Sequence, residues 1–368
     1  MISFKLPSLG ADMTEGKLLT WHVKPGDTVK RGQVVAVVDT SKAAIDVEIW
    51  QSGVVQELLV LPGEKVPVGT VLATLREPGD VLASPQMAAL TDAAKDTSAD
   101  SGAPNPELSL VAAEQTALPA ALAALSPAAA TDRQKDIRQA IATAMSRSKR
   151  EIPHYYLAET IPMQTAMTWL QQRNLGVPIA QRMLPAVLLL KAVAVALKRT
   201  PELNGFYIDG QFQPSAAVHA GVAISLRGGG LVAPAMLDAQ RKPLGQLMRE
   251  LVDLVKRARA GSLRSSEMSD ATLTITNLGD QGVESVFGVI YPPQVALVGF
   301  GSIVVRPWVT DGVVSAQPVV CATLAADHRV SDGHRGALFL AELRDVLQQP
   351  QMLAAAFTAT DTLMGDTA

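Results

Sequence analysis

A histidine and an aspartate four residues apart, His328 and Asp332, have the types and spacing to move a proton. Histidine titrates near neutral pH, so an imidazole on a rigid support can act as a general acid or base. Gly333 follows directly and marks a turn. Alone, the pattern is weak, because a single histidine beside a glycine turn is more often structural.

The flanking sequence predicts the elements that must position this histidine. Residues 318–326 are apolar and β-prone, and residues 333–347 carry apolar side chains at helical spacing. We therefore expect His328 on a turn that leaves a strand and enters a helix. Such a turn can present an imidazole to a substrate from a fixed scaffold.

Length and composition limit the classes of protein that fit. The 368 residues predict two or three structural units, and a net charge of −3 favours neither nucleic acid nor an anionic membrane as partner. The single cysteine, Cys321, excludes an intramolecular disulfide; we expect a buried structural thiol in a reducing compartment. The apolar run at 184–197 contains Lys191, is too short to span a bilayer and predicts a buried helix. We expect a soluble cytoplasmic protein without a metal site.

An internal repeat dominates the N-terminal region. Residues 21–36 and 58–73 align at an offset of 37, with Pro-Gly pairs at 25–26 and 62–63 followed by alternating apolar residues. This pattern is typical of strands and tight turns. Neither half can bury a face alone, so the repeat predicts a small two-fold β sandwich.

Lys42 lies between the two halves, on the polar stretch Thr-Ser-Lys at 40–42 that separates two β-prone segments. We expect it at the tip of a tight hairpin. Most lysines at such positions are merely solvated, but the surrounding repeat argues for more. Residues 1–77 resemble a lipoyl domain, on the motifs that lie at residues 6–10, 15–16, 23–27 and 39–43. The resemblance implies lipoate attached to Lys42. Ser41 and Ala43 stand where biotin carriers usually place methionines, which favours lipoate over biotin.

The C-terminal region, residues 132–368, predicts a mixed α/β domain. We expect helices at 184–199, 244–260 and 334–348, and strands near 217–225, 271–276, 295–300 and 317–326. Residues 132–350 resemble the catalytic domain of the 2-oxo acid dehydrogenase acyltransferases, which is related in fold to chloramphenicol acetyltransferase. The matching motifs lie at residues 152–156, 229–234, 273–279, 292–297 and 327–333.

The resemblance implies roles for individual residues. His328 would be the general base that takes a thiol proton, and Thr276, where many members have serine, would donate to the oxyanion. Asp332 would order the loop. Arg138 and residues 146–149 are candidates for coenzyme A contacts by charge alone. We expect His154 to have a structural rather than a catalytic role, and His219 to be packed or hydrogen-bonded to nearby residues. His22 and His334 are expected at the surface.

The stretch 78–131 is rich in Ala, Pro, Ser, Thr and Asp and predicts an extended, partly flexible linker. In the acyltransferase family this region often holds a small helical module that binds partner enzymes. Residues 83–90 faintly resemble its opening, but the glycine-rich loop and basic residues expected afterwards are absent. The sequence therefore indicates that this module is lost or degenerate.

The resemblance also implies an assembly and partners. The family's active site is a channel between subunits of a trimer, so we expect at least a homotrimer. The tail after residue 357 is polar where many members end in leucines, which favours a free trimer over a large cage. The expected partners are a 2-oxo acid decarboxylase and dihydrolipoyl dehydrogenase.

Three hypotheses about function are compatible with the sequence. The leading one is an acyltransferase that passes an acyl group, acetyl by family frequency, from its own lipoyl-Lys42 to coenzyme A; branched-chain acyl and succinyl groups are alternatives. The second is a non-catalytic lipoyl-bearing scaffold, which the histidine motif argues against. The third is a free-standing thiol acetyltransferase with an external acceptor.

Overall fold

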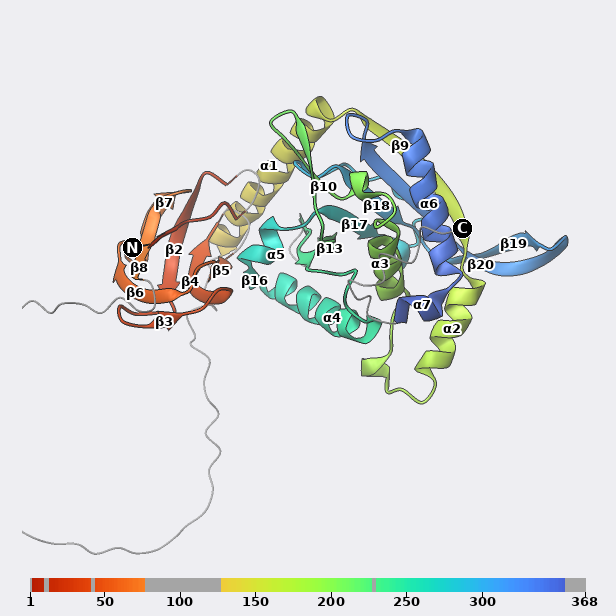
Figure 1. The fold of residues 1–368 in the computed structure, drawn as a ribbon, viewed down its shortest axis with the longest axis horizontal. Coiled ribbons are helices and arrows are strands. Elements are labelled where there is room, and N and C mark those ends of the chain that lie inside the picture. The colour runs from red at the N-terminus through yellow and green to blue at the C-terminus, as the bar shows by residue number, and fades with distance from the viewer. Residues whose placement is uncertain (1, 10–12, 41–43, 77–126, 227–229, 355–368) are drawn as a thin grey trace, which may run out of the picture.

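The chain folds into two domains, as the computed structural model in Figure 1 shows. The structure describes residues 2–9, 13–40, 44–76, 127–226 and 230–354. The N-terminal part builds one hydrophobic core and the C-terminal part another. The expected linker at 78–131 and the faint module at 83–90 lie almost entirely outside the described residues; only 127–131 are described, as the start of helix α1.

The N-terminal domain is a sandwich of two antiparallel sheets. One has the strand order β1-β8-β6-β3 and the other contains β5-β4-β2-β7. The strands are β1 (Ile2–Lys5), β2 (Glu15–Trp21), β3 (Thr28–Val29), β4 (Gln33–Asp39), β5 (Ala44–Ile49), β6 (Gly53–Leu58), β7 (Lys65–Pro67) and β8 (Val71–Arg76). This arrangement confirms the predicted two-fold β sandwich.

The internal repeat has matching backbone geometry in its two halves. Gly26 and Gly63 have φ values of 96° and 95°, a region in which glycine is favoured because it lacks a Cβ. The Asp27 carboxylate accepts a hydrogen bond from the Lys24 N–H (2.8 Å), and the Glu64 carboxylate accepts one from the Leu61 N–H (3.1 Å). These aligned acidic residues therefore close equivalent turns.

The C-terminal domain is built on a mixed seven-stranded sheet. Its order is β15-β12-β17-β18-β20-β19, with β9 also paired to β20. The strands are β9 (His154–Pro162), β12 (Ala220–Val222), β15 (Ala235–Met236), β17 (Leu273–Asn277), β18 (Ala296–Phe300), β19 (Val304–Thr310) and β20 (Val313–Asp327). Short pairs flank it: β10 (Gly205–Ile208) with β11 (Gln211–Pro214), and β13 (Ile224–Ser225) with β14 (Leu231–Val232).

Helices complete the domain, and α6 packs against β9 and β20 beside α3. They are α1 (Pro127–Glu151), α2 (Gln164–Asn174), α3 (Pro185–Ala196), α4 (Leu244–Ala260), α5 (Ser265–Ser269), α6 (Gly333–Leu347) and α7 (Pro350–Ala354), with 3-10 turns at Ile179–Gln181, Pro201–Leu203 and Gly279–Gln281. The three predicted helices are confirmed to within a few residues. Gly261 ends α4 with φ 74°, a left-handed cap. The mixed α/β fold is thus as expected.

Helix α3 confirms the prediction of a buried apolar helix, including its lysine. Lys191 has no exposed surface, and its ammonium donates to the carbonyl oxygens of Gln240 (2.7 Å), Lys242 (2.7 Å) and Ala239 (3.3 Å). Burial lowers the pKa of Lys191 to about 8, so the group is mainly protonated at pH 7. Across the described residues, no helix is long and apolar enough to span a bilayer.

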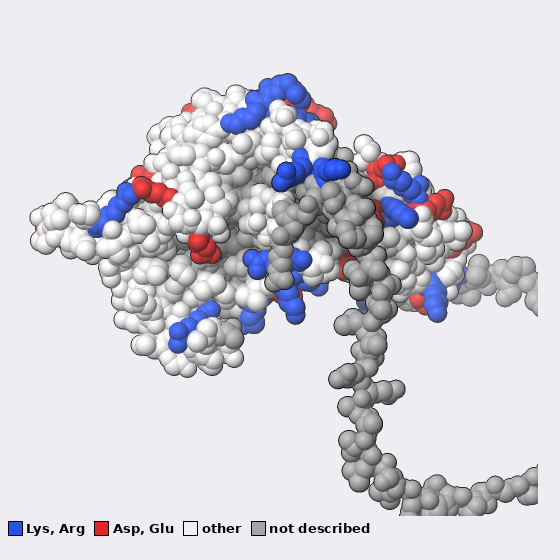
Figure 2. All heavy atoms as spheres, turned by 180° about the vertical axis from the view of Figure 1, so that it is seen from behind, with Lys and Arg blue, Asp and Glu red and all other residues white. Residues whose placement is uncertain are grey.

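Strand β19 and the first half of β20 form a ribbon that projects from the sheet (Figure 1). It exposes apolar side chains, including Val305, Val309, Val313 and Val314 at 63–69% exposure. On the face shown in Figure 2, the end of the ribbon carries almost no charged side chains. Exposed apolar area on a long two-stranded ribbon is a feature of surfaces that another chain covers.

The two domains touch through strand β5. A two-residue strand of the C-terminal domain, β16 (Leu263–Arg264), pairs with it in parallel, so the N-terminal sheet gains a strand from the other domain. Met268 packs against both hydrophobic cores.

Candidate functional site

The turn that carries His328 is held by an ion pair in which the carboxylate is buried and the guanidinium is partly exposed. Asp327 ends β20 with no exposed surface, and its carboxylate accepts hydrogen bonds from the Arg329 N–H (2.9 Å), Nε (2.9 Å) and Nη2 (2.6 Å). The Arg329 guanidinium lies 3.9 Å from the centre of the Tyr207 ring. These contacts bend the chain back on itself. No role for Asp327 or Arg329 was predicted from the sequence.

The same turn fixes the backbone and the ring of His328. Its N–H donates to the Pro153 carbonyl oxygen at 3.0 Å, and its imidazole meets the Tyr155 ring edge-on at 5.4 Å. The Tyr155 hydroxyl lies 2.9 Å from the Ser331 Oγ. His328 is nevertheless exposed, and its ring nitrogens have no hydrogen-bond partner among the described residues. The imidazole is therefore oriented but available.

Asp332 caps helix α6. Its carboxylate accepts a hydrogen bond from the Arg335 N–H at 3.0 Å. That bond, followed by weaker contributions from His334 and His328, lowers the pKa of Asp332, so it is a carboxylate at neutral pH. Asp332 thus fixes the first turn of α6, and its role in ordering the catalytic loop stays a prediction.

We expect Asp327→Asn to lower the free energy of unfolding by about 1–3 kcal/mol, since a buried charged partner of Arg329 is lost. Thermal unfolding of the variant measures the loss. Asp345→Asn is the matched control, because Asp345 also pairs with an arginine but is 60% exposed; there we expect a change of under about 1 kcal/mol. Equal losses in both variants would contradict the role given to Asp327.

Thr276 lies at the other end of the sheet from His328. It is half-buried on β17 and pairs with Gly299 on β18, which in turn pairs with Thr323 on β20. His328 lies five positions after Thr323, which is roughly 17 Å along the strand direction, and two strand spacings add about 10 Å across the sheet. One chain therefore does not bring the two side chains together.

The remaining histidines match their expected places. The Nε2 of His154 accepts from the Ile290 N–H at 3.1 Å, which leaves Nδ1 to donate to the Ile152 carbonyl at 2.8 Å. Burial lowers the pKa of His154, so this structural histidine is neutral at pH 7. The Nδ1 of His219 accepts from the Asp238 N–H. His22 and His334 are exposed. Cys321 is half-buried rather than buried, because it lies where the projecting ribbon leaves the sheet.

The residues suggested for coenzyme A lie on α1. Arg138 is exposed, and so are Arg147 and Lys149, whereas Ser148 is buried and donates to the Ile290 carbonyl oxygen. Arg147 and Arg329 both line a hollow of about 450 Å³ beside the His328 turn. Glu151, which pairs with Arg147 at 2.9 Å, and Asp209 line the same hollow, so its lining carries both signs of charge.

Lys42 itself lies outside the described residues, but the strands around it are described. Strands β4 and β5 pair in antiparallel fashion up to Asp39 and Ala44. The predicted position of Lys42 at a hairpin tip therefore stays a prediction.

The β sandwich and the α/β domain with its oriented histidine each match a known family. A family model for the catalytic domain of 2-oxoacid dehydrogenases acyltransferases matches residues 127–355. A biotin and lipoyl domain model, described as biotin-requiring enzyme, matches residues 2–75. Since the first match spans more than half of the chain, the protein belongs to the 2-oxoacid dehydrogenase acyltransferase family.

Curated relatives extend over nearly the whole chain. The dihydrolipoyllysine-residue acetyltransferase component of the pyruvate dehydrogenase complex of Zymomonas mobilis is 28% identical, covering 95% of this chain and 98% of that protein. The component of the same name from Staphylococcus aureus is also 28% identical, covering 95% of this chain and 98% of that protein.

Solved structures share the C-terminal fold. The dihydrolipoamide acetyltransferase of Azotobacter vinelandii is 29% identical with a TM-score of 0.56, covering 59% of this chain and 90% of that one. A probable dihydrolipoamide acetyltransferase of Listeria monocytogenes is 27% identical with a TM-score of 0.54, covering 63% of this chain and 94% of that one. The Azotobacter study concerns the catalytic roles of a serine, a histidine 52 residues later and an asparagine four residues after the histidine.

Proposed function

We propose that this protein is a dihydrolipoyllysine-residue acetyltransferase, which moves an acetyl group between its own lipoyl-Lys42 and coenzyme A as the core of a pyruvate dehydrogenase complex. The oriented but exposed His328 carries the proposal. The relatives named above support acetyl as the group transferred.

Residue spacing supports the site assignment. In this chain Thr276 lies 52 residues before His328, and Asp332 lies four residues after it. These are the spacings of the serine, histidine and asparagine whose catalytic roles were studied in the Azotobacter protein. Threonine keeps the hydroxyl of serine, and Asp332 keeps an acceptor that caps α6.

The chain's residues then divide the work of thiol–thioester exchange. A free thiol has a pKa of about 8.5 and is mostly protonated at pH 7, so His328 takes the proton of the coenzyme A thiol. The resulting thiolate attacks the acyl carbonyl, the bond to the sulfur that carried the acyl group breaks, and that sulfur takes the proton from His328 and leaves as a thiol. Thr276, whose hydroxyl makes no hydrogen bond within the described part of the chain, donates to the oxyanion that develops there. Lipoate, when attached to Lys42, supplies the thiol that carries the acyl group.

The separation of Thr276 from His328 supports a site formed between chains. If each centre combines His328 of one chain with Thr276 of the next, a closed ring is required, and a homotrimer is the assembly we propose. The exposed valines of the β19–β20 ribbon offer the apolar area that such an interface buries.

We expect sedimentation of the purified chain at three times its 38.8 kDa mass. A monomer that retains full activity would contradict the shared site. A mass of many trimers would contradict our preference for a free trimer over a cage, which rests on the polar tail after residue 357.

The proposal includes the organisation and partners of the chain. We propose a lipoyl domain at 1–77, a linker at 78–131 with a lost or degenerate binding module, and a catalytic domain at 132–368. The expected partners are the 2-oxo acid decarboxylase and dihydrolipoyl dehydrogenase. The lone cysteine supports a reducing, cytoplasmic location.

Thr276→Val should lower kcat for acyl transfer by about 10²–10³-fold, because it keeps the shape of the side chain but removes the oxyanion donor. Thr276→Ser is the matched control and should stay within about tenfold of the original. The measurement is steady-state transfer between acetyl-coenzyme A and free dihydrolipoamide. Equal activity in the valine and serine variants would remove the hydroxyl from the mechanism.

A panel of acyl donors tests the proposed function as a whole. Acetyl-, isobutyryl- and succinyl-coenzyme A are compared with free dihydrolipoamide as acceptor. Preference for acetyl supports the proposal, and preference for a branched-chain or succinyl group would reassign the substrate within the family. A folded protein with no activity on any of them would be a lipoyl-bearing scaffold.

A further inference from the structure

The contact between the two domains involves the strand that directly follows the attachment lysine. Without β16, strand β5 would be the open edge of its sheet, because the order is β16-β5-β4-β2-β7. Leu263 pairs with Ile45 and Arg264 with Asp46 in parallel register. Addition of a strand to an open sheet edge is a recurring mode of recognition, with backbone hydrogen bonds for affinity and side chains for selectivity.

A buried carboxylate at this contact provides the selectivity. Along β5 the side chains of Ile45, Val47 and Ile49 point into the core of the N-terminal domain, so Glu48 points to the opposite face. It is nevertheless only 7% exposed, because the C-terminal domain covers it. An acidic side chain that is buried only where two domains meet is costly unless the second domain supplies its partners.

The C-terminal domain supplies those partners from Ser265 and Ser266. The Glu48 carboxylate accepts hydrogen bonds from the Ser266 hydroxyl and, at 3.3 Å, from the Ser266 N–H. In return the Glu48 N–H donates to the Ser265 Oγ at 3.1 Å. The carboxylate also lines a hollow with Arg257 and Arg264. A side chain without an acceptor at position 48 would leave the Ser266 hydroxyl and N–H without this partner, whereas the Ser265 contact uses the backbone of Glu48 and would remain.

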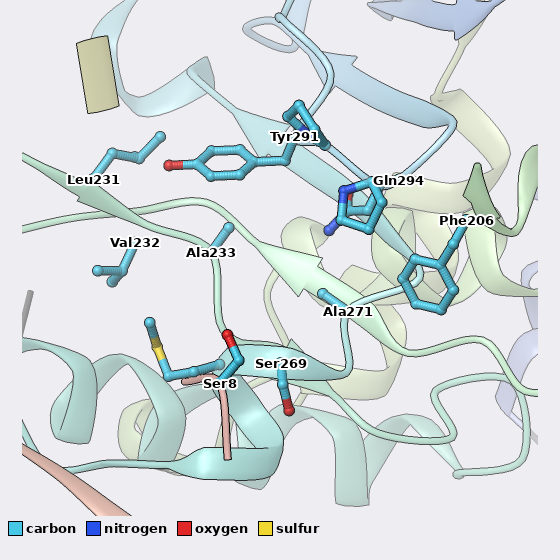
Figure 3. Close-up of a pocket in the computed structure, with 12 residues that line it drawn as sticks. Ser8, Phe206, Leu231, Val232, Ala233, Ser269, Ala271, Tyr291 and Gln294 are labelled. Carbon is cyan, nitrogen blue, oxygen red and sulfur yellow. The ribbon is translucent and has the colours of Figure 1, made fainter. Parts of the chain in front are cut away.

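The contact also adjoins a cavity between the domains. Ser8 of the N-terminal domain and Met268, Tyr291 and Gln294 of the C-terminal domain are among the residues that line a space of about 280 Å³ (Figure 3). Strand β5 begins at Ala44, two residues after Lys42. The contact therefore involves the part of the carrier domain nearest in sequence to the attachment lysine.

We propose that residues 263–268 form a recognition surface for a lipoyl domain and that Glu48 is the residue by which it selects the lipoyl domain of this chain. The fitting partner is a lipoyl domain with an open β5 edge and a carboxylate six residues after its lysine. The docking of the lipoyl domain does not depend on acyl transfer. The contribution of docking to acyl transfer rests on the proposed function.

Hydrogen exchange of the full chain tests the surface. In Glu48→Ala and in Ser266→Ala we expect the amides of residues 44–49 and 263–266 to exchange about tenfold or more faster than in the original protein. Glu57→Ala, which alters an exposed glutamate on β6, is the matched control and should change nothing. Equal exchange in all three variants would overturn the proposal. Unchanged protection of β8 in Glu48→Ala shows that the lipoyl domain remains folded.

Acylation of the chain's own lipoyl group tests the role in transfer. With acetyl-coenzyme A as donor, the initial rate followed by mass spectrometry should fall about tenfold in Glu48→Ala and Ser266→Ala. Transfer to free dihydrolipoamide should be unchanged in both, which shows that the catalytic site is intact. An unchanged rate for the attached lipoyl group would overturn the selecting role of Glu48. If the original protein showed no transfer to free dihydrolipoamide, the proposed function would instead be refuted.

Discussion

His328→Ala is expected to lower kcat for acetyl transfer between coenzyme A and free dihydrolipoamide by about 10²–10⁴-fold, the usual contribution of a positioned general base. The fold should survive, because the exposed imidazole makes only a ring contact with Tyr155 and the turn is held by Asp327 and Arg329. The measurement is steady-state kinetics with thermal unfolding as the check on folding.

His334→Ala is the matched control for this variant. His334 is also an exposed histidine, six residues further along the chain and on the first turn of α6. Its loss should leave kcat within about twofold. If the two variants lost activity equally, the decline would reflect damage to the loop, and His328 would not be the base.

Lys42→Arg is expected to reduce pyruvate-dependent acetyl-coenzyme A formation to background, at least about a hundredfold, in a complex reconstituted with the partner enzymes. Arginine keeps the charge but cannot take lipoate, so the chain loses the tethered thiol and its millimolar effective concentration. Transfer to free dihydrolipoamide should be unchanged, because the catalytic domain is intact.

The control is Lys17→Arg, at an exposed lysine on the neighbouring strand β2. It should retain both the lipoyl group, seen by mass spectrometry, and the full rate of the complex. A free-standing thiol acetyltransferase with an external acceptor would show intact flux in Lys42→Arg, and that result would restore the third hypothesis.

Local patterns in the sequence predicted the elements that depend on neighbouring residues. The turn before α6, the Gly261 cap of α4 and the two-fold N-terminal repeat all follow from short-range backbone preferences and hydrophobic periodicity. Lys191 was expected within a buried helix, but its carbonyl partners at 239–242 lie about fifty residues away in sequence. No local pattern identifies partners at that separation.

The candidate catalytic site also combines features that local sequence predicts with features that depend on distant residues. His328, Asp332 and Thr276 were singled out by motif, yet their division between two ends of a sheet depends on strand order and register. The ion pair of Asp327 with Arg329 joins two positions of the motif at 327–333, and an acidic residue two positions before a basic one was the available signal. Strand β16 has only two residues, too few for any periodicity to show.

The placement of His328 and Thr276 at opposite ends of one sheet has a genetic consequence. In the proposed ring each active centre takes its base, His328, from one chain and its hydroxyl, Thr276, from the next. A chain that lacks one of these two groups therefore inactivates only one of the two centres to which it contributes. A trimer that mixes chains lacking the base with chains lacking the hydroxyl always contains one centre with both. Two inactive alleles would then complement each other, and each would be only partly dominant over the wild type.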